Sequence, residues 1–162
     1  MYLFSKIADV SMYTNDFHFY MTPIDCRSSK DFLRFIGSTI LLGLLTITPR
    51  RIVYYSSGAV EVENSWYAFF KKLHERMLRK SDLILRIPHV YSSDRDQGLI
   101  KVLKDGTFRG DKDITLEYIT DDDFREFFIR NVDKEGIVNY DGEYHKDTIF
   151  DIERKFVGIA TP

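Results

Sequence analysis

The sequence predicts an α/β fold, a Rossmann-like parallel sheet with helices on both of its faces. Short apolar segments alternate with longer amphipathic ones along the chain, which is the strand–helix order of parallel sheets. Segments such as RIVYY at 51–55 and LILRI at 83–87 are apolar at nearly every position, as expected for strands buried on both faces. With 162 residues the chain can enclose one ordinary core, so we expect a single domain over 1–162.

The first three elements are a strand, a long helix and a second strand. Residues 15–23 are predicted to form the first strand, and Ser28 or Ser29 can cap the helix that follows. Pro49 ends this helix, and the strand 51–55 comes directly after it. The apolar residues of the helix recur at helical spacing: Phe32, Phe35, Ile36, Ile40, Leu41 and Leu44.

The most clearly patterned helix covers residues 65–80. Its apolar side chains share one face, which we expect to pack into the core: Trp66, Phe69, Phe70, Leu73 and Met77. A turn at Ser81 and Asp82 leads into the strand 83–87, which Pro88 stops.

The second half continues the alternation of strands and helices. In order, we expect a helix over 97–104, a strand over 114–119, a helix from Thr120 or Asp121 to Asn131, a strand over 136–140 and a helix over 148–156. The three carboxylates Asp121, Asp122 and Asp123 could suggest a cation site. Capping of the helix that follows them is the favoured interpretation.

Composition excludes several functional classes. A formal net charge of -2 argues against a nucleic-acid surface. Cys26 is the only cysteine, so a disulfide framework or a multi-cysteine metal site is not expected, and the four histidines share no metal-ligand spacing. The apolar run 39–48 is too short to span a bilayer, and the N-terminus does not read as a secretory signal. We therefore expect a cytoplasmic protein that binds neither nucleic acid nor membrane.

Polar residues at the strand ends are the candidates for chemistry, because ligands of open parallel sheets bind beyond the carboxyl ends of the strands. Ser56 and Ser57 follow one strand, and Tyr67 and Lys71 lie one helical turn apart on the next helix. A lysine ammonium favours the phenolate of a neighbouring tyrosine and so prepares it for proton transfer. Taken alone, this spacing is also that of ordinary surface helix residues.

Several motifs that follow one another along the chain indicate a function more specifically than the Tyr67 and Lys71 pair does. Ser56, Ser57 and Val60 stand where a Ser-Ser-x-x-Val pattern is expected, and Tyr67, Lys71 and Glu75 form Tyr-x-x-x-Lys-x-x-x-Glu. Arg86, Val90 and Tyr91 then form Arg-x-x-x-Val-Tyr, and LEYITDDDF, GIVN and TIFDI follow in order. This series resembles the extended short-chain dehydrogenase/reductase family, which contains the NAD-dependent nucleotide-sugar epimerases and dehydratases.

The resemblance implies a role for each matching residue. Ser57 would be the catalytic hydroxyl, Tyr67 the acid/base and Lys71 its electrostatic partner. Ser56, Lys71, Pro88 and His89 would bind the cofactor, NAD or NADP, and the substrate would be a nucleotide sugar. Residues 1–110 would be the sheet core and 111–162 a remnant of the family's C-terminal substrate region.

The departures from the family concern the cofactor. No glycine precedes Gly37, whereas the family begins with a strand and a glycine-rich turn whose backbone approaches the pyrophosphate. We therefore expect a fold that lacks the first strands and this turn. Two functions follow: a degenerate relative with weak or no cofactor binding that acts as a binding or assembly module, or an active enzyme using Ser57, Tyr67 and Lys71, with a partner chain completing the site.

The same departure predicts an uncovered sheet edge, which invites pairing with another strand. Either the N-terminal 14 residues cover this edge or the chain forms a homo-oligomer or binds a partner protein there.

Overall fold

The computed structural model describes residues 17–21, 29–62, 65–94 and 98–158. They form two compact units, one made of Met1–Ile87 and Phe128–Tyr140 and the other of Pro88–Phe127 and Asp141–Pro162. The first unit is therefore built from two separate stretches of chain. The split near residue 110 into a sheet core and a C-terminal remnant rests on the family resemblance and stays a prediction.

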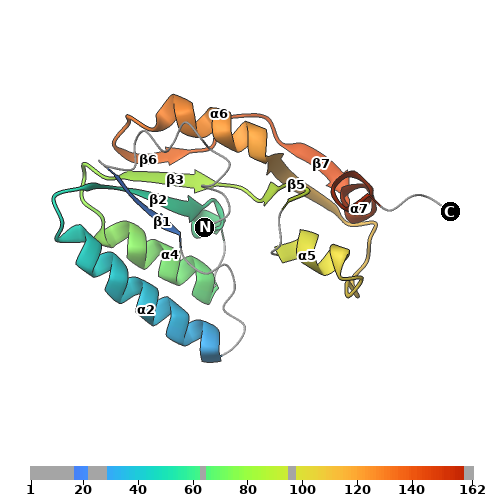
Figure 1. The fold of residues 1–162 in the computed structure, drawn as a ribbon, viewed down its shortest axis with the longest axis horizontal. Coiled ribbons are helices and arrows are strands. Elements are labelled where there is room, and N and C mark those ends of the chain that lie inside the picture. The colour runs from blue at the N-terminus through green and yellow to red at the C-terminus, as the bar shows by residue number, and fades with distance from the viewer. Residues whose placement is uncertain (1–16, 22–28, 63–64, 95–97, 159–162) are drawn as a thin grey trace. The chain divides into compact units, whose positions relative to one another are not determined.

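The first unit holds a four-stranded parallel sheet of β1 (Phe17–Met21), β2 (Arg51–Ser57), β3 (Leu83–Ile87) and β6 (Gly136–Asn139), in the order β1-β2-β3-β6 (Figure 1). Each expected strand of this sheet is present, and the predicted parallel pairing is confirmed. Among the described strands, β1 lies at one end of the sheet.

Helices cover both faces of this sheet. Tyr54 points to the face of α4 (Trp66–Met77), where its ring meets His74 at 5.8 Å. The next residue, Tyr55, points the other way and meets Phe128 of α6 (Asp121–Asn131) at 6.4 Å. This alternation follows from the two-residue period of a strand, and it buries β2 on both sides.

The long helix α2 (Ser29–Thr46) lies beside α4 (Figure 1). Phe35 stacks on Phe70 of α4 with their ring centres 4.9 Å apart. The short helix α3 (Ala59–Val62), which the sequence pattern did not indicate, connects β2 to α4. The expected cap at Ser28 lies outside the described residues.

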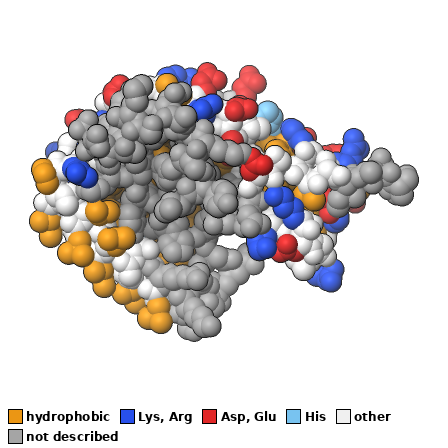
Figure 2. All heavy atoms as spheres, in the orientation of Figure 1, with side chains coloured by type: hydrophobic (Ala, Val, Ile, Leu, Met, Phe, Trp, Pro, Cys, Tyr) orange, Lys and Arg blue, Asp and Glu red, His pale blue; other side chains and the backbone are white. Residues whose placement is uncertain are grey.

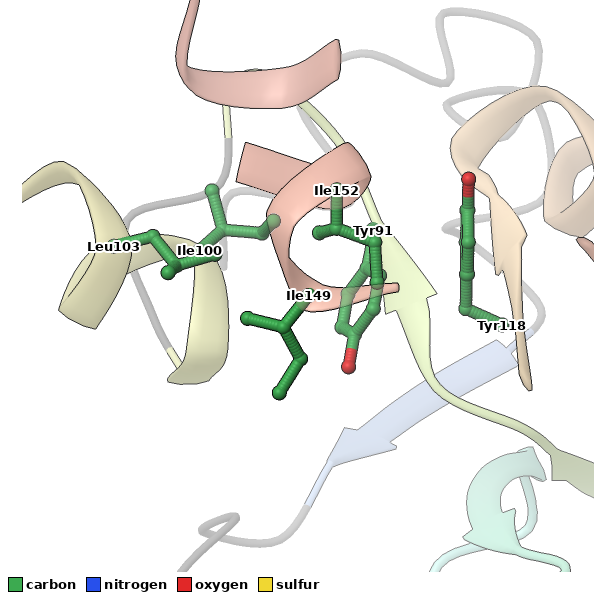
Figure 3. Close-up of a cluster of buried hydrophobic side chains, with 6 residues drawn as sticks. All are labelled: Tyr91, Ile100, Leu103, Tyr118, Ile149 and Ile152. Carbon is green, nitrogen blue, oxygen red and sulfur yellow. The ribbon is translucent and has the colours of Figure 1, made fainter. Parts of the chain in front are cut away.

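The second unit has a three-stranded sheet of β4 (Val90–Tyr91), β5 (Thr115–Thr120) and β7 (His145–Thr148), flanked by α5 (Gly98–Lys104) and α7 (Ile149–Val157). Its buried side chains come from the sheet and both helices: Tyr91, Ile100, Leu103, Tyr118, Ile149 and Ile152 (Figure 3). The strand β7 was not predicted, and it pairs antiparallel to β5.

The start of α6 confirms one capping prediction, and the cap of α4 was not predicted. Thr120 Oγ1 accepts a hydrogen bond from Asp123 N, and Asp123 Oδ2 accepts one from Thr120 N, so the pair forms a reciprocal capping box. Ser65 caps α4 through the backbone N–H of Ala68. Of the three carboxylates at the start of α6, Asp123 therefore serves the helix end.

One packing prediction was wrong. Trp66 and Phe69 of α4 are 63% and 54% exposed, although the pattern predicted that they would be part of the core. Helical periodicity identifies an apolar face but does not show whether another element covers that face. None of the helices in the described part of the chain is long and apolar enough to span a membrane.

Candidate active site

The candidate site lies where β2 ends and α4 begins. The strand ends at Ser57, and the Ser65 cap starts α4 two residues before Tyr67. Because Tyr67 and Lys71 are one turn apart, the start of the helix directs both side chains to the same side. The structure thus brings Lys71 and Tyr67 together beside β2.

Lys71 is almost fully buried, with 4% of its surface exposed. Its Nζ donates a 2.7 Å hydrogen bond to the backbone oxygen of Tyr55. The same ammonium lies 5.0 Å from the centre of the Tyr54 ring and 5.6 Å from that of Tyr67, within the range of cation–π attraction. Burial lowers the pKa of Lys71 from 10.5 to about 7, while the charge of Glu75 partly opposes the drop.

Tyr67 is half-buried and accessible for chemistry. Its ring packs edge-on against Phe35 of α2 at 6.4 Å. The Lys71 ammonium lies over the same ring, 5.6 Å from its centre. The structure therefore places a phenol and an ammonium side by side, and proton transfer by this pair stays a prediction.

The two serines have different surroundings. Ser56 is buried, and its hydroxyl donates a 2.5 Å hydrogen bond to Glu75 Oε1. Ser57 is the last residue of β2 and is half-buried, beside Ile87 of β3 in the strand register. Ser57 is thus placed at the carboxyl edge of the sheet, where a ligand would reach it.

Sequence reasoning did not assign to the site a charged network that lies beside Ser56. Arg86 makes two hydrogen bonds to Glu75, at 3.0 Å through Nε and 2.8 Å through Nη2, and a third bond to Glu61. These bonds raise the pKa of Arg86. The network ties α3, α4 and β3 to Ser56, so it holds the end of β2 in place. Glu75 belongs to the Tyr-x-x-x-Lys-x-x-x-Glu motif and Arg86 to the Arg-x-x-x-Val-Tyr motif, so their positions in these motifs could have identified them.

His74 is the second buried basic residue on α4, fully enclosed between α2 and β2. Its Nε2 lies 2.7 Å from Thr39 Oγ1, and its Nδ1 lies 3.1 Å from the Tyr54 hydroxyl. Burial, with the nearby charge of Lys71, lowers the pKa of His74 to about 4. His74 is therefore neutral at physiological pH and connects three elements behind the site.

Pro88 and His89 begin the second unit. His89 is exposed, and its ring stacks on Tyr91 with centres 6.2 Å apart. Their expected role beside a nicotinamide ring stays a prediction. Among the described residues, no group of three or more His, Cys, Asp or Glu side chains is placed to hold a metal ion.

Comparison with known proteins gives no match for the sequence among protein-family models or curated proteins. Solved structures do match. The enzyme WbmH of Bordetella bronchiseptica, in complex with NAD+, has a TM-score of 0.67 and 13% identity over 94% of this chain and 62% of that chain. The enzyme WbmG of the same organism, in complex with NAD and UDP, has a TM-score of 0.62 and 16% identity over 95% and 60%.

A third similar structure is the UDP-glucose 4-epimerase of Thermus thermophilus in complex with NAD, with a TM-score of 0.57 and 17% identity over 94% of this chain and 65% of that chain. The chain therefore spans less than two thirds of the length of each of these three enzymes. At such low identity the likeness establishes the fold. The chain therefore has the Rossmann-like fold that these three enzymes share.

Proposed function

We propose that these 162 residues are a degenerate relative of the NAD-dependent nucleotide-sugar epimerases and dehydratases, acting as a binding or assembly module with weak or no cofactor binding of their own. The fold likeness to NAD-bound structures supports the relationship. The order of the motifs around Ser57, Tyr67 and Lys71 supports it further.

The observation that carries the proposal is that two groups expected to bind the cofactor already have partners inside the protein. The Lys71 ammonium donates to the Tyr55 carbonyl, and the Ser56 hydroxyl donates to Glu75. The Ser56 hydroxyl has a single proton, so it would have to break its bond to Glu75 in order to donate to a cofactor, which costs roughly 1–3 kcal/mol. The Lys71 ammonium would keep its bond to the Tyr55 carbonyl and reach a ribose hydroxyl only with its two other N–H donors.

The sequence adds a second reason, because no glycine precedes Gly37. A glycine-rich turn allows backbone N–H groups to approach the pyrophosphate at a helix N-terminus, where much of the cofactor's affinity arises. Residues 1–36 contain no glycine-rich turn that would hold the pyrophosphate of NAD, which supports weak or no cofactor binding by these residues.

Calorimetric titration of NAD, NADH and NADP into the purified chain tests the proposal. We expect no saturation at millimolar cofactor. Saturable binding in the micromolar range would contradict the proposal, provided that Lys71→Met weakens it. Lys72→Met is the matched control, because Lys72 is the exposed neighbour of Lys71 on the same helix.

The alternative function is an active oxidoreductase of the epimerase or dehydratase type, working on a nucleotide sugar with NAD or NADP. The specific observation in its favour is the pKa of Lys71, lowered to about 7 beside the Tyr67 ring. Catalytic groups need such values near working pH. In this function Tyr67 transfers the proton, Lys71 tunes it, and Ser57 hydrogen-bonds the reacting oxygen.

An epimerase assay with UDP-sugars and added NAD tests the alternative. Suppose that the chain turns over substrate, that Tyr67→Phe abolishes this activity and that Tyr144→Phe leaves it intact. This result would establish the oxidoreductase function and would contradict the proposal of a degenerate binding or assembly module. Tyr144 is a suitable control because it is an exposed tyrosine of the second unit.

Partners follow from the same reasoning. A nucleotide sugar is the proposed ligand, and another polypeptide that supplies a pyrophosphate turn would restore cofactor binding. The proposed route of association is strand pairing at β1, the end strand of the described sheet. We place this function in the cytoplasm.

A further inference from the structure

Three turns lie at the edge of the first unit's sheet where its strands begin. They are residues 47–50 before β2, 78–82 before β3 and 132–135 before β6. Because these three strands are parallel, their turns share one edge (Figure 1). We name the surface that they form the amino-edge surface. Ser57 and the candidate site lie at the opposite, carboxyl edge.

Arg79 joins two of these turns. Its Nη1 donates a 2.8 Å hydrogen bond to the backbone oxygen of Thr48, and its Nη2 donates to that of Arg50. The same guanidinium pairs at 2.9 Å with Asp82, which is fully buried. One arginine therefore fixes the turn 78–82 against the turn before β2.

Arg51 joins the third turn to the others. Its Nε donates to the backbone oxygen of Ser81 at 2.9 Å, and its Nη1 donates to that of Val132 at 3.1 Å. The backbone N–H of Gly136 adds a 2.8 Å bond to the backbone oxygen of Asp82. The three turns are therefore cross-linked into one surface, so binding a partner there requires little further ordering.

The amino-edge surface is basic, although the chain as a whole has a formal net charge of -2. With the helix ends next to them, the turns cover residues 48–51, 76–82 and 130–136, which contain seven Arg or Lys against three Asp or Glu. The carboxyl ends of α2, α4 and α6 precede these turns, and each helix dipole offsets roughly half of one positive charge. A positive excess therefore remains after the helix ends are satisfied.

Much of this charge is available to an external partner. Four cationic side chains are exposed, and none has an ion pair or hydrogen bond within the part of the chain that the structure describes: Arg50, Arg76, Lys80 and Lys134. Figure 2 shows Lys or Arg side chains at this end of the first unit. In the second unit, by contrast, four lysines are paired with carboxylates: Lys101, Lys112, Lys146 and Lys155.

We propose that the amino-edge surface binds a partner protein through an acidic segment of that partner. Carboxylates of the segment pair with the exposed cations, and the two arginines among them can bind a carboxylate through two parallel hydrogen bonds. Asp133 and Glu135 are also exposed on the third turn, so the partner meets them with a cationic side chain. These two carboxylates disfavour a nucleic acid, whose backbone presents phosphates and no cations.

This inference does not rest on the proposed function, because the surface is separate from Ser57, Tyr67 and Lys71. It holds for a binding module and for an active enzyme alike, since a partner at the amino edge leaves the carboxyl edge open. It also differs from strand pairing at β1, which uses backbone groups along a strand rather than side chains in the turns.

Fluorescence anisotropy of a labelled oligoglutamate peptide, titrated with the full chain, tests the proposal. We expect saturable binding that Arg50→Glu combined with Lys80→Glu weakens at least about tenfold, because two attractions become repulsions. Arg109→Glu combined with Arg154→Glu is the matched control. Both are exposed arginines of the second unit, so the net charge changes equally and binding should change by less than about twofold. Raising the salt from about 0.1 M to about 1 M should abolish binding, because the Debye length falls from about 10 Å to about 3 Å.

Circular dichroism checks that the variants fold, and Lys80→Gln, which only removes one charge, is a second variant that should weaken binding about threefold. An oligoglutamate peptide that does not bind at about 0.1 M salt would overturn the proposal. So would a control pair that weakens binding as much as the amino-edge pair, because net charge rather than this surface would then attract the peptide. Tighter binding of a labelled DNA duplex than of the peptide would overturn it as well, by identifying a phosphate backbone as the occupant.

Discussion

Replacing Lys71 with Met should stabilise the fold at neutral pH. The pKa of Lys71 falls from 10.5 to about 7 on burial. At ~1.4 kcal/mol for each pH unit, keeping this ammonium charged in the fold costs about 5 kcal/mol relative to the unfolded chain. The variant avoids that cost, but leaving the Tyr55 carbonyl without its partner takes back roughly 1–3 kcal/mol. We therefore expect a net gain of about 2–4 kcal/mol.

The pH dependence of this gain makes the prediction specific. Because the folded pKa lies below the unfolded one, the cost of Lys71 is fully present below about pH 7 and fades as the pH rises toward 10.5. Urea denaturation of wild type and Lys71→Met at about pH 6 and about pH 10 measures the difference. A variant less stable than wild type at the lower pH, or a gain that is the same at both, would refute the reasoning. Lys72→Met, at an exposed position, should change stability by less than about 0.5 kcal/mol.

Three further predictions concern buried polar groups of the first unit. The pKa of His74 is about 4 in the folded protein against 6.5 in the unfolded chain, so about 3 kcal/mol of folding stability is lost as the pH falls from 6.5 to about 4. His74→Gln should remove this loss, so its urea midpoint should change less with pH over that range. Asp82 is fully buried and accepts hydrogen bonds from Ile52 N and the side chain of Arg79, so Asp82→Ala should lower the free energy of unfolding by about 3 kcal/mol. A double-mutant cycle of Glu75→Gln and Arg86→Gln should give a coupling energy of about 2 kcal/mol.

Controls for these measurements exist in the second unit. Lys101 and Asp105 form an exposed ion pair at 2.9 Å one helical turn apart, and their coupling should stay below about 0.5 kcal/mol. Equal coupling in the two cycles would contradict the idea that burial strengthens the Glu75–Arg86 pair. An unchanged pH profile in His74→Gln would show that another group controls acid stability.

Local sequence patterns were enough to predict most strands of the sheet in the first unit. The segments RIVYY and LILRI are apolar at every position except one arginine each, and Pro88 marks the end of the second, so β2 and β3 could be predicted closely. The strand β7 has the sequence HKDT, which carries no strand signal, and it forms because β5 offers it hydrogen bonds. Such a strand depends on tertiary pairing and is invisible to periodicity.

In the candidate site, too, residues related by local spacing could be predicted, whereas partners brought together by packing could not. Tyr67 and Lys71 could be identified because their spacing is local to one helix. The partners of Ser56 and His74 could not, since Glu75, Thr39 and Tyr54 reach them only after helices and strand have packed. The exposure of Trp66 was missed for a related reason: an amphipathic pattern does not distinguish an apolar face that is packed from one that stays exposed.

The two-part construction of the first unit has a consequence for biosynthesis. The strand β6 pairs with β3 but is translated after the whole stretch 88–127, so a growing chain that ends anywhere before Gly136 exposes one side of β3. The apolar sequence LILRI at that open side is a template for pairing with other chains. Nascent or C-terminally shortened forms are therefore the species that need a chaperone, and aggregation should fall once β6 has left the ribosome.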